Sequence, residues 1–246
     1  SRTVATSNVN SRRVRLPHLT AWLAANPVDA IALQETKLPD ADFPVADLQA
    51  LGWNSAFSGQ RTYNGVAILS RELATDVVAG IPGFEDEQRR VLAASLGSLR
   101  VIDVYVPNGQ TVGSEKFAYK LRWFDALRKY VAAELTRHPH LVVLGDFNVA
   151  PEDRDVHDPK AWEGSVHVSP PERAALQALL GTGLADCFRL FDQPPNTFSW
   201  WDYRAGAWQN NRGLRIDHMW ASASLAAKCT GCWIDKAPRA LTLPSD

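Results

Sequence analysis

The sequence predicts an α/β or α+β domain with buried sheets, and two patterns favour that class. Short apolar runs rich in β-branched residues recur along the chain and end at polar or turn-forming residues, as buried strands do. Between some of these runs lie stretches with apolar residues at helical spacing, which are typical of helices that cover a sheet.

The predicted strands are short and end abruptly. A first strand ends before Asn8 and Asn10, and a second ends at Gln34-Glu35. Their length and the turn residues beside them favour strands over helices. The apolar runs after the first strand cover residues 30–33, 65–69, 101–106, 141–144 and 215–221.

Three helices are predicted around these strands. Apolar residues recur at helical spacing over residues 17–25 and 114–137, and Pro171-Glu172 opens a third helix. Proline suits the first turn of a helix, where its missing N–H would have no partner. The connection over residues 150–171 is long, and long loops in compact domains tend to be functional. No linker-like segment interrupts residues 1–246, so we expect a single domain.

Composition and charge exclude several classes of protein. The 246 residues contain no run of about 18 apolar residues, so we expect no membrane span. Three cysteines do not make a disulfide framework, and we therefore expect a cytoplasmic protein. The lone pair Cys229 and Cys232 lacks the four ligands of a structural zinc site. A net charge of −1 argues against wholesale binding of a polyanion but allows a local basic face.

Carboxylates and amides follow the predicted strands. Glu35 follows one strand, Asp146 and Asn148 follow another, and Asp217 lies inside an apolar run. A carboxylate in a buried strand costs several kcal/mol (roughly) unless it is paired, hydrogen-bonded or bound to metal. Oxygen donors without a cluster of cysteine or histidine suit a hard cation, so we expect Mg²⁺, with Mn²⁺ as the alternative.

Each of these residues also has a simpler explanation. Glu35 alone could cap a strand, and the Gly145-Asp146-Phe147-Asn148 segment alone could be a turn. Asp217 could pair with Arg215 or Arg212. The order of the whole set along the chain is the more specific signal.

That order resembles the exonuclease III and abasic-site endonuclease family, within the endonuclease/exonuclease/phosphatase superfamily. Leu33-Gln34-Glu35-Thr36-Lys37 and Gly145-Asp146-Phe147-Asn148 are among the matching motifs. The matching segments run through the chain in family order and cover residues 5–11, 33–37, 63–67, 105–109, 145–151, 198–204, 211–217 and 243–246.

The resemblance implies a four-layer α/β sandwich, with two packed mixed sheets flanked by helices, and it implies a role for each polar residue. Glu35 would be the main magnesium ligand, helped by Asn8, Asn10 and Asp246. Asp146 would orient or deprotonate the attacking water. Tyr105 and Asn148, with Asn8, would hold the scissile phosphate, and Asp217 would orient a catalytic histidine.

The sequence departs from the family in two places. Ser7 stands where the family usually has tryptophan or phenylalanine, and we expect a loss of packing there rather than of chemistry. The family motif continues with histidine after the position of Asp246, so we expect that histidine and a last strand to be missing from the 246 residues.

Candidate DNA contacts fall into two groups. The basic residues would bind phosphates and thereby position the protein on double-stranded DNA. The apolar residues would line a pocket for a flipped-out sugar without a base, unless Trp200 belongs to a sheet core. The first group is Arg12, Arg13, Lys116, Lys120, Arg204 and Arg212, and the second is Trp200, Leu214 and Ile216.

His167 lies near the end of the long loop. A surface position is the simpler expectation for it. The alternative hypothesis is that its ring narrows the pocket and favours trimming of 3′ ends over cleavage at internal abasic sites.

The predicted activity is magnesium-dependent hydrolysis of DNA phosphodiesters by a monomeric repair nuclease. It would act as a 3′-to-5′ exonuclease or 3′-phosphodiesterase, as an abasic-site endonuclease, or as both. Two alternatives stay open: a phosphodiesterase for lipid or inositol phosphates, and a non-catalytic DNA-binding relative.

Overall fold

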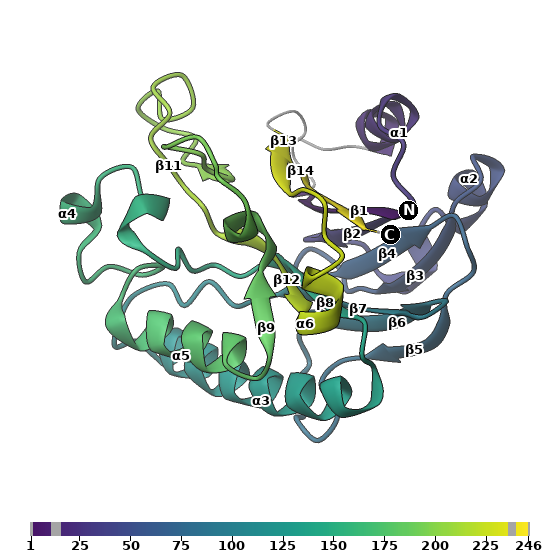
Figure 1. Cartoon of the computed structure of the whole chain (residues 1–246), viewed down its shortest axis with the longest axis horizontal. Coiled ribbons are helices and arrows are strands. Elements are labelled where there is room, and N and C mark those ends of the chain that lie inside the picture. Colours follow the sequence, from purple (N-terminus) through teal and green to yellow (C-terminus); the bar gives the residue numbers. More distant parts are fainter. Residues whose placement is uncertain (1, 11–15, 236–239, 246) are drawn as a thin grey trace.

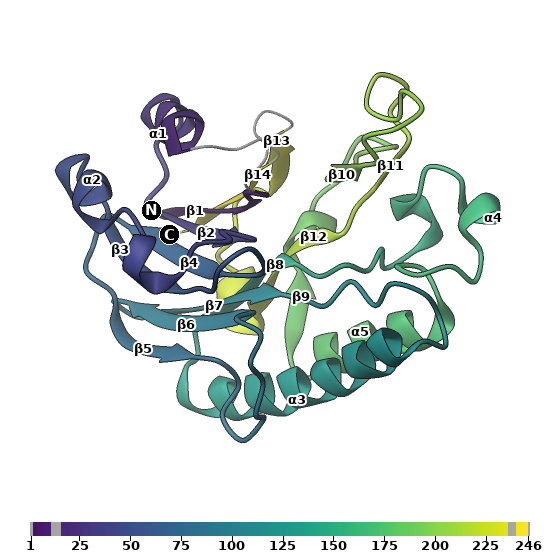
Figure 2. The ribbon, with the colours of Figure 1, turned by 180° about the vertical axis from the view of Figure 1, so that it is seen from behind.

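The computed structural model describes residues 2–10, 16–235 and 240–245. Two sheets pack face to face in the middle of the molecule, and helices lie on their outer sides (Figures 1 and 2). This arrangement confirms the α/β prediction and the four layers that the resemblance implied.

The first sheet has six strands in the order β13-β14-β1-β2-β4-β3. Its two central strands, β1 and β2, run parallel, and the other neighbours run antiparallel. The strands are β1 (Arg2–Asn8), β2 (Ala30–Gln34), β3 (Asn54–Ser58), β4 (Val66–Ser70), β13 (Trp233–Asp235) and β14 (Ala240–Ser245).

The second sheet also has six strands, in the order β5-β6-β7-β8-β12-β9. Again one central pair, β7 and β8, is parallel. The strands are β5 (Thr75–Ala79), β6 (Val91–Leu96), β7 (Leu99–Tyr105), β8 (Leu141–Asp146), β9 (Leu184–Asp186) and β12 (Asp217–Ser222). A separate ribbon of β10 (Trp200–Trp201) and β11 (Gly213–Leu214) projects away from both sheets (Figure 2).

Helices cover the outer face of each sheet. The long helices α3 (Glu115–Arg137) and α5 (Pro170–Leu180) lie side by side on the second sheet (Figure 1). The start of α3 is fixed by Ser114, whose Oγ accepts a hydrogen bond from the Phe117 backbone N–H at 3.2 Å. The others are α1 (Leu16–Ala25) and α2 (Val45–Ala50) on the first sheet, and the short α4 (Pro159–Trp162) and α6 (Ala223–Ala226).

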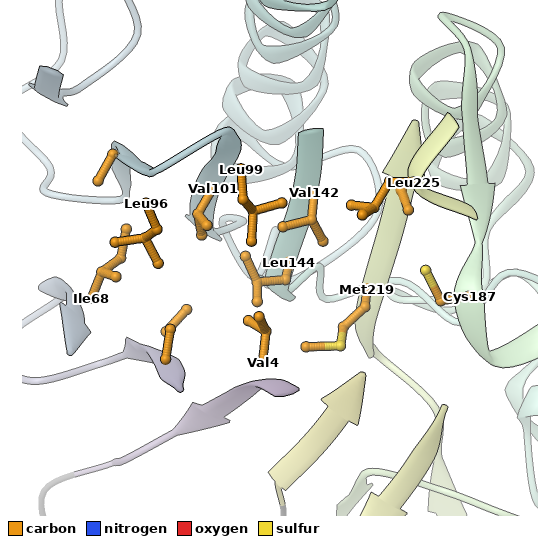
Figure 3. Close-up of a cluster of buried hydrophobic side chains, with 14 of the residues drawn as sticks. Val4, Ile68, Leu96, Leu99, Val101, Val142, Leu144, Cys187, Met219 and Leu225 are labelled. Carbon is orange, nitrogen blue, oxygen red and sulfur yellow. The ribbon is translucent and has the colours of Figure 1, made fainter. Parts of the chain in front are cut away.

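Apolar side chains fill the space between the layers. Val4 and Ile68 of the first sheet meet Leu144 and Met219 of the second in one buried cluster (Figure 3). Burial of such side chains contributes roughly 1.5–3 kcal/mol each. This cluster fixes the two sheets against each other, and therefore fixes the relative positions of residues at their edges.

The predicted elements agree with the structure, and their boundaries differ from the observed ones by one or two residues. The strands expected over residues 30–33, 65–69, 101–106 and 141–144 are β2, β4, β7 and β8. The last one, β12, begins at Asp217 and not at Arg215, because the backbone of Arg215 bonds to Asp155 and that of Ile216 to Phe147. Asp217 therefore stands at the start of its strand rather than inside it.

Neither cysteine of the expected pair is at the surface. Cys232 is buried and Cys229 is half-buried, and both belong to the core between the sheets. In residues 2–10, 16–235 and 240–245, no helix is long and apolar enough to cross a bilayer.

One histidine, His218, is fully buried. It lies in β12, between β8 and β9 of the second sheet. Its Nε2–H donates to the Val149 carbonyl at 2.9 Å, and its Nδ1 accepts from Arg215 Nη1 at 3.1 Å. Burial, and next the positive charge of Arg215, lower the pKa of His218 from 6.5 to about 4. The ring is therefore neutral in the folded protein at neutral pH.

This depressed pKa predicts acid-labile stability. Below pH 6.5 the histidine binds a proton in the unfolded protein but not in the folded one. The contribution of neutral His218 to the free energy of unfolding is therefore complete above pH 6.5 and is lost as the pH falls toward about 4. The free energy of unfolding should fall between pH 6.5 and about pH 5 in the parent protein. In His218→Gln, which lacks the titrating ring, we expect this fall to be smaller by about 1–2 kcal/mol. Urea unfolding followed by tryptophan fluorescence measures this, and parallel pH dependences would contradict it.

Candidate active site

Strand direction brings the polar residues of both sheets to one place. The parallel strands β1 and β2 end at the same edge of the first sheet, and β7 and β8 do so in the second. Because β12 runs antiparallel to β8, its first residue pairs with the last residue of β8. The ends of five strands therefore meet at one side of the paired sheets.

A cavity opens at this meeting point. The predicted residues Asn8, Asn10, Glu35, Tyr105, Asp146, Asn148, His167, Trp200, Ile216 and Asp217 all line it. Side chains that are scattered through the sequence therefore converge on a single pocket.

Two carboxylates lie at the floor of this pocket. Asn8 bridges them: its Nδ2 donates to Glu35 Oε1 at 2.9 Å and to Asp146 Oδ2 at 2.9 Å. Asp146 is buried, and its Oδ1 also accepts from the Asn148 backbone N–H at 3.0 Å. Burial, and next the negative charge of Glu35, raise the pKa of Asp146 from 3.8 to about 7. Positive charge beside the pair comes from Lys37, whose Nζ lies 3.7 Å from Glu35 Oε2.

The side chains of Asn8 and Asn10 are held by hydrogen bonds within the protein. Asn8 Oδ1 accepts from the Asn10 backbone N–H at 3.0 Å, and Asn10 Oδ1 accepts from Lys37 Nζ at 2.8 Å. Both side-chain oxygens are therefore engaged within the protein, and Asn8 turns its NH₂ group toward the acids. The expectation that both help to hold a metal ion stays a prediction, and in this arrangement Asn8 also holds the two acids together.

Glu35 and Asp146 nevertheless fit a hard divalent cation. Mg²⁺ is commonly held by one or two carboxylates, with water and substrate phosphate completing its ligands. Within the described ranges, no group of three or more His, Cys, Asp or Glu side chains could hold a metal, which excludes an all-protein cage there. Asp246, the expected additional ligand, lies outside the described residues.

Tyr105 and Asn148 present polar groups to the same pocket. The Tyr105 hydroxyl hydrogen-bonds with Glu35, and burial followed by the charges of Glu35 and Asp146 raises the pKa of this tyrosine. It therefore remains a protonated donor. Asn148 adopts the left-handed conformation (φ 50°), and its Nδ2 donates to the Val106 carbonyl at 2.7 Å, which fixes the side chain.

Asp217 stands directly across from Asp146 at the β8–β12 pair. Its backbone N–H donates to Ser199 Oγ at 3.0 Å. Of the two arginines expected as possible partners of Asp217, Arg215 is bound by Asp155 at 2.7 Å and by Asp186 at 2.8 Å, and Arg212 is exposed.

One wall of the pocket is aromatic and apolar. Trp200 and Ile216 line it as predicted, and the His167 ring stands 6.3 Å from the Trp200 ring between centroids. Leu214 does not line it: its side chain is buried behind the wall, packed with Val156 and its neighbours. His167 is buried at 6% exposure, so the expectation of a surface histidine was wrong.

The predicted basic residues divide into three sets. Lys116, Arg204 and Arg212 are exposed, and Lys116 borders a second cavity that shares Asn108 with the pocket. Lys120 has no exposed surface and bonds to groups of the protein interior, so the prediction that it contacts DNA phosphates was wrong. Arg12 and Arg13 lie outside the described residues.

Three further residues line the pocket that the sequence did not single out: Asn108, Ser199 and Tyr203. All three lie within the motifs that carry the family resemblance, residues 105–109 and 198–204. The signal was therefore present, but a motif does not tell which of its side chains face a cavity.

The described part of the last motif lies at the end of β14 that is farther from the pocket. In the β1–β14 pair, Ser245 is opposite Arg2 and Ala240 is opposite Ser7. Residues 243–245 thus lie at the end of β1 remote from Asn8.

Known proteins share this fold and sequence. Residues 5–246 match the Endonuclease/Exonuclease/phosphatase family. Exodeoxyribonuclease III of Haemophilus influenzae is 36% identical over 252 residues, which cover 97% of this chain and 94% of that protein.

Two solved structures extend the likeness. The 3′ phosphatase NExo from Neisseria, bound to a product DNA hairpin, is 44% identical with a TM-score of 0.97 over 100% of both chains. An AP endonuclease from Archaeoglobus fulgidus is 34% identical with a TM-score of 0.94, again over 100% of both chains. The chain therefore belongs to the endonuclease/exonuclease/phosphatase family and, within it, to the exonuclease III group.

Proposed function

We propose that this protein is a DNA-repair nuclease that hydrolyses phosphodiester bonds in the pocket at the sheet edge, with Mg²⁺ or Mn²⁺ as cofactor. The observation that carries the proposal is the convergence of Glu35, Asp146, Asn148 and Asp217 on one cavity. The exodeoxyribonuclease III relative and the neighbour bound to a DNA hairpin support DNA as the substrate.

The chemistry follows from the charge of the substrate. A phosphodiester is anionic and repels nucleophiles, and a divalent cation at Glu35 would offset that charge. Tyr105 and Asn148 would hold the phosphate, because the tyrosine is a protonated donor and the asparagine is fixed by Val106.

Asp146 is suited to act on the attacking water. A buried carboxylate whose pKa is raised to about 7 can accept a proton near neutral pH, whereas an ordinary aspartate is too weak a base. The Asn148 backbone N–H and the Asn8 amide fix its two oxygens, so its direction toward the water is set before the substrate binds. Asp217, beside it, would orient a further polar group, for which the family resemblance implies a histidine.

The substrate face is defined by three kinds of side chain. Lys116, Arg204 and Arg212 would contact phosphates, and Trp200 with Ile216 would accept an apolar sugar face. His167 occupies part of the same wall. We propose that double-stranded DNA with a 3′ end is preferred to DNA with an internal abasic site, because the ring reduces the room for a flipped-out sugar.

The metal role of Glu35 is tested by Glu35→Gln, which keeps the shape of the side chain. We expect Mn²⁺ affinity, measured by calorimetry, to fall strongly, and kcat on a 3′-recessed duplex to fall by about a hundredfold or more. Asp47→Asn, in the exposed α2, is the matched control and should retain both.

The same assay separates the alternative functions. The parent protein and Glu35→Gln are incubated with Mg²⁺ and a 3′-recessed duplex, an abasic duplex or a phosphoinositide. Cation-dependent cutting of either DNA supports the proposal. Cutting of the phosphoinositide alone, or DNA binding without any cation-dependent cutting, would replace it with the lipid-phosphatase or the non-catalytic alternative.

The pocket-narrowing role of His167 is tested by His167→Gly. The backbone there is left-handed (φ 79°), which glycine adopts without strain, so the fold should tolerate the change. We expect cleavage of an abasic duplex to rise at least about tenfold relative to 3′-end trimming, because one well-placed group is worth about 1–3 kcal/mol in discrimination.

The control for this variant is His157→Gly in the same loop, where the side chain is exposed and does not line the pocket. The hypothesis is rejected if the His167 variant shows no gain in abasic-site incision or if the control shows the same gain.

A further inference from the structure

A fully buried ion pair lies beneath the pocket. Lys120 of α3 and Glu172 of α5 have no exposed surface, and Lys120 Nζ donates to Glu172 Oε2. A buried ion pair is often no more stabilising than apolar residues of similar size. Stability alone is therefore a weak explanation for charges at this position.

The Lys120 ammonium binds both loops that follow the central strands of the second sheet. Besides Glu172, it donates to the Asn108 carbonyl at 3.0 Å and to the Asn148 carbonyl at 2.8 Å. The side chains of these same two asparagines line the pocket. All three donors of the ammonium are thus used, and two of them hold residues of the site.

Glu172 fixes a third segment. Its carboxylate accepts from the His167 backbone N–H at 2.9 Å and 3.0 Å and from Ser169 Oγ at 2.6 Å. The His167 ring contacts the same carbonyl as Lys120, since its Nδ1–H donates to the Asn148 carbonyl at 2.7 Å. The direction of this bond is fixed because a carbonyl oxygen can only accept, and burial lowers the pKa of His167 to about 4, so the ring is neutral.

The backbone held by this pair is strained or tightly packed. Asn148 is left-handed (φ 50°), a conformation that few residues other than glycine adopt and that its hydrogen bonds here help to hold. At Gly109, a Cβ atom would lie 2.8 Å from Lys120 Cδ, so the stem of the lysine packs directly under the loop. Both loops therefore depend on the lysine for their position.

We propose that Lys120 and Glu172 are positioning residues for phosphodiester hydrolysis. They hold Asn108 and Asn148 in the arrangement that receives the scissile phosphate, without touching the substrate themselves. The inference deepens the proposed function and rests on it for its catalytic part.

The test compares two buried ion pairs of the same chain. Lys120→Met with Glu172→Gln removes the pair beneath the pocket and leaves no unpaired charge. Arg100→Met with Glu134→Gln is the control, because that pair is equally buried (3.1 Å apart, 2% and 1% exposed) but lies at the start of β7, remote from Tyr105. General loss of packing should be similar in both.

We expect kcat on a 3′-recessed duplex to fall between about ten- and a hundredfold in the first variant, with little change in KM. The control should keep its kcat once the folded fraction is corrected for. Equal kcat losses in the two variants, or full kcat in the first, would overturn the proposal.

Hydrogen–deuterium exchange gives a readout that needs no activity. Exchange should become faster in residues 107–111 and 147–151 of the first variant and not of the control. If the parent cuts no DNA, the proposed function fails, yet selective faster exchange still supports positioning. Unchanged exchange in both segments overturns it.

If the double variant does not fold, Lys120→Arg replaces it. Arginine keeps the charge beside Glu172, but its planar guanidinium directs its donors differently from an ammonium, so the two carbonyls cannot be held as before. A smaller fall in kcat in the same direction is expected, and an unchanged kcat with unchanged exchange overturns the proposal.

Discussion

The pocket depends on keeping two acids, Glu35 and Asp146, close together at the edge of two different sheets. The core between the sheets sets their distance, and Asn8 donates to both with one amide group. Their mutual repulsion, added to burial, is what raises the pKa of Asp146 to about 7. Two acids held this close repel each other, and a divalent cation held by them would offset that repulsion, so the proposed cofactor and the raised pKa of Asp146 have one origin in the fold.

The buried ion pair of Lys120 and Glu172 lies beneath the pocket and holds the loops that line it. Lys120 and Glu172 connect the loops after β7 and β8 with the loop that carries His167. The residues that face the cavity therefore do not stand on independent loops. Two buried side chains join the three segments, so the proposed positioning role couples the loops of Asn108 and Asn148 to the loop of His167.

Much of the fold could be predicted from the sequence, because buried strands and amphipathic helices leave strong periodic signals. The strand boundaries at Glu35 and Asp146 followed from apolar runs that end at acids. The convergence of these acids was implied only by the family resemblance, because Glu35 and Asp146 follow strands of two different sheets and periodicity does not tell how two sheets face each other. The start of β12 was misplaced, because Arg215 and Ile216 are extended but bond to loops rather than to a neighbouring strand.

The direction in which individual side chains point could not be predicted from the periodicity of the sequence. Lys120 was expected on the surface with Lys116, but it points into the protein, where Glu172 neutralises it. His167 in the long loop and Leu214 in β11 were misplaced for the same reason, since their burial depends on partners far away in the chain. The orientation of the Asn8 amide follows only from its contacts with two acids and with Asn10.

The most direct measurement is an anomalous difference map from crystals soaked in Mn²⁺. A peak within coordination distance of the Glu35 carboxylate and beside Asp146, lost in Glu35→Gln, is the expected result. A pocket that stays without a peak at saturating Mn²⁺, or a peak bound elsewhere on the protein, would contradict the proposal that these acids are held together for a cation.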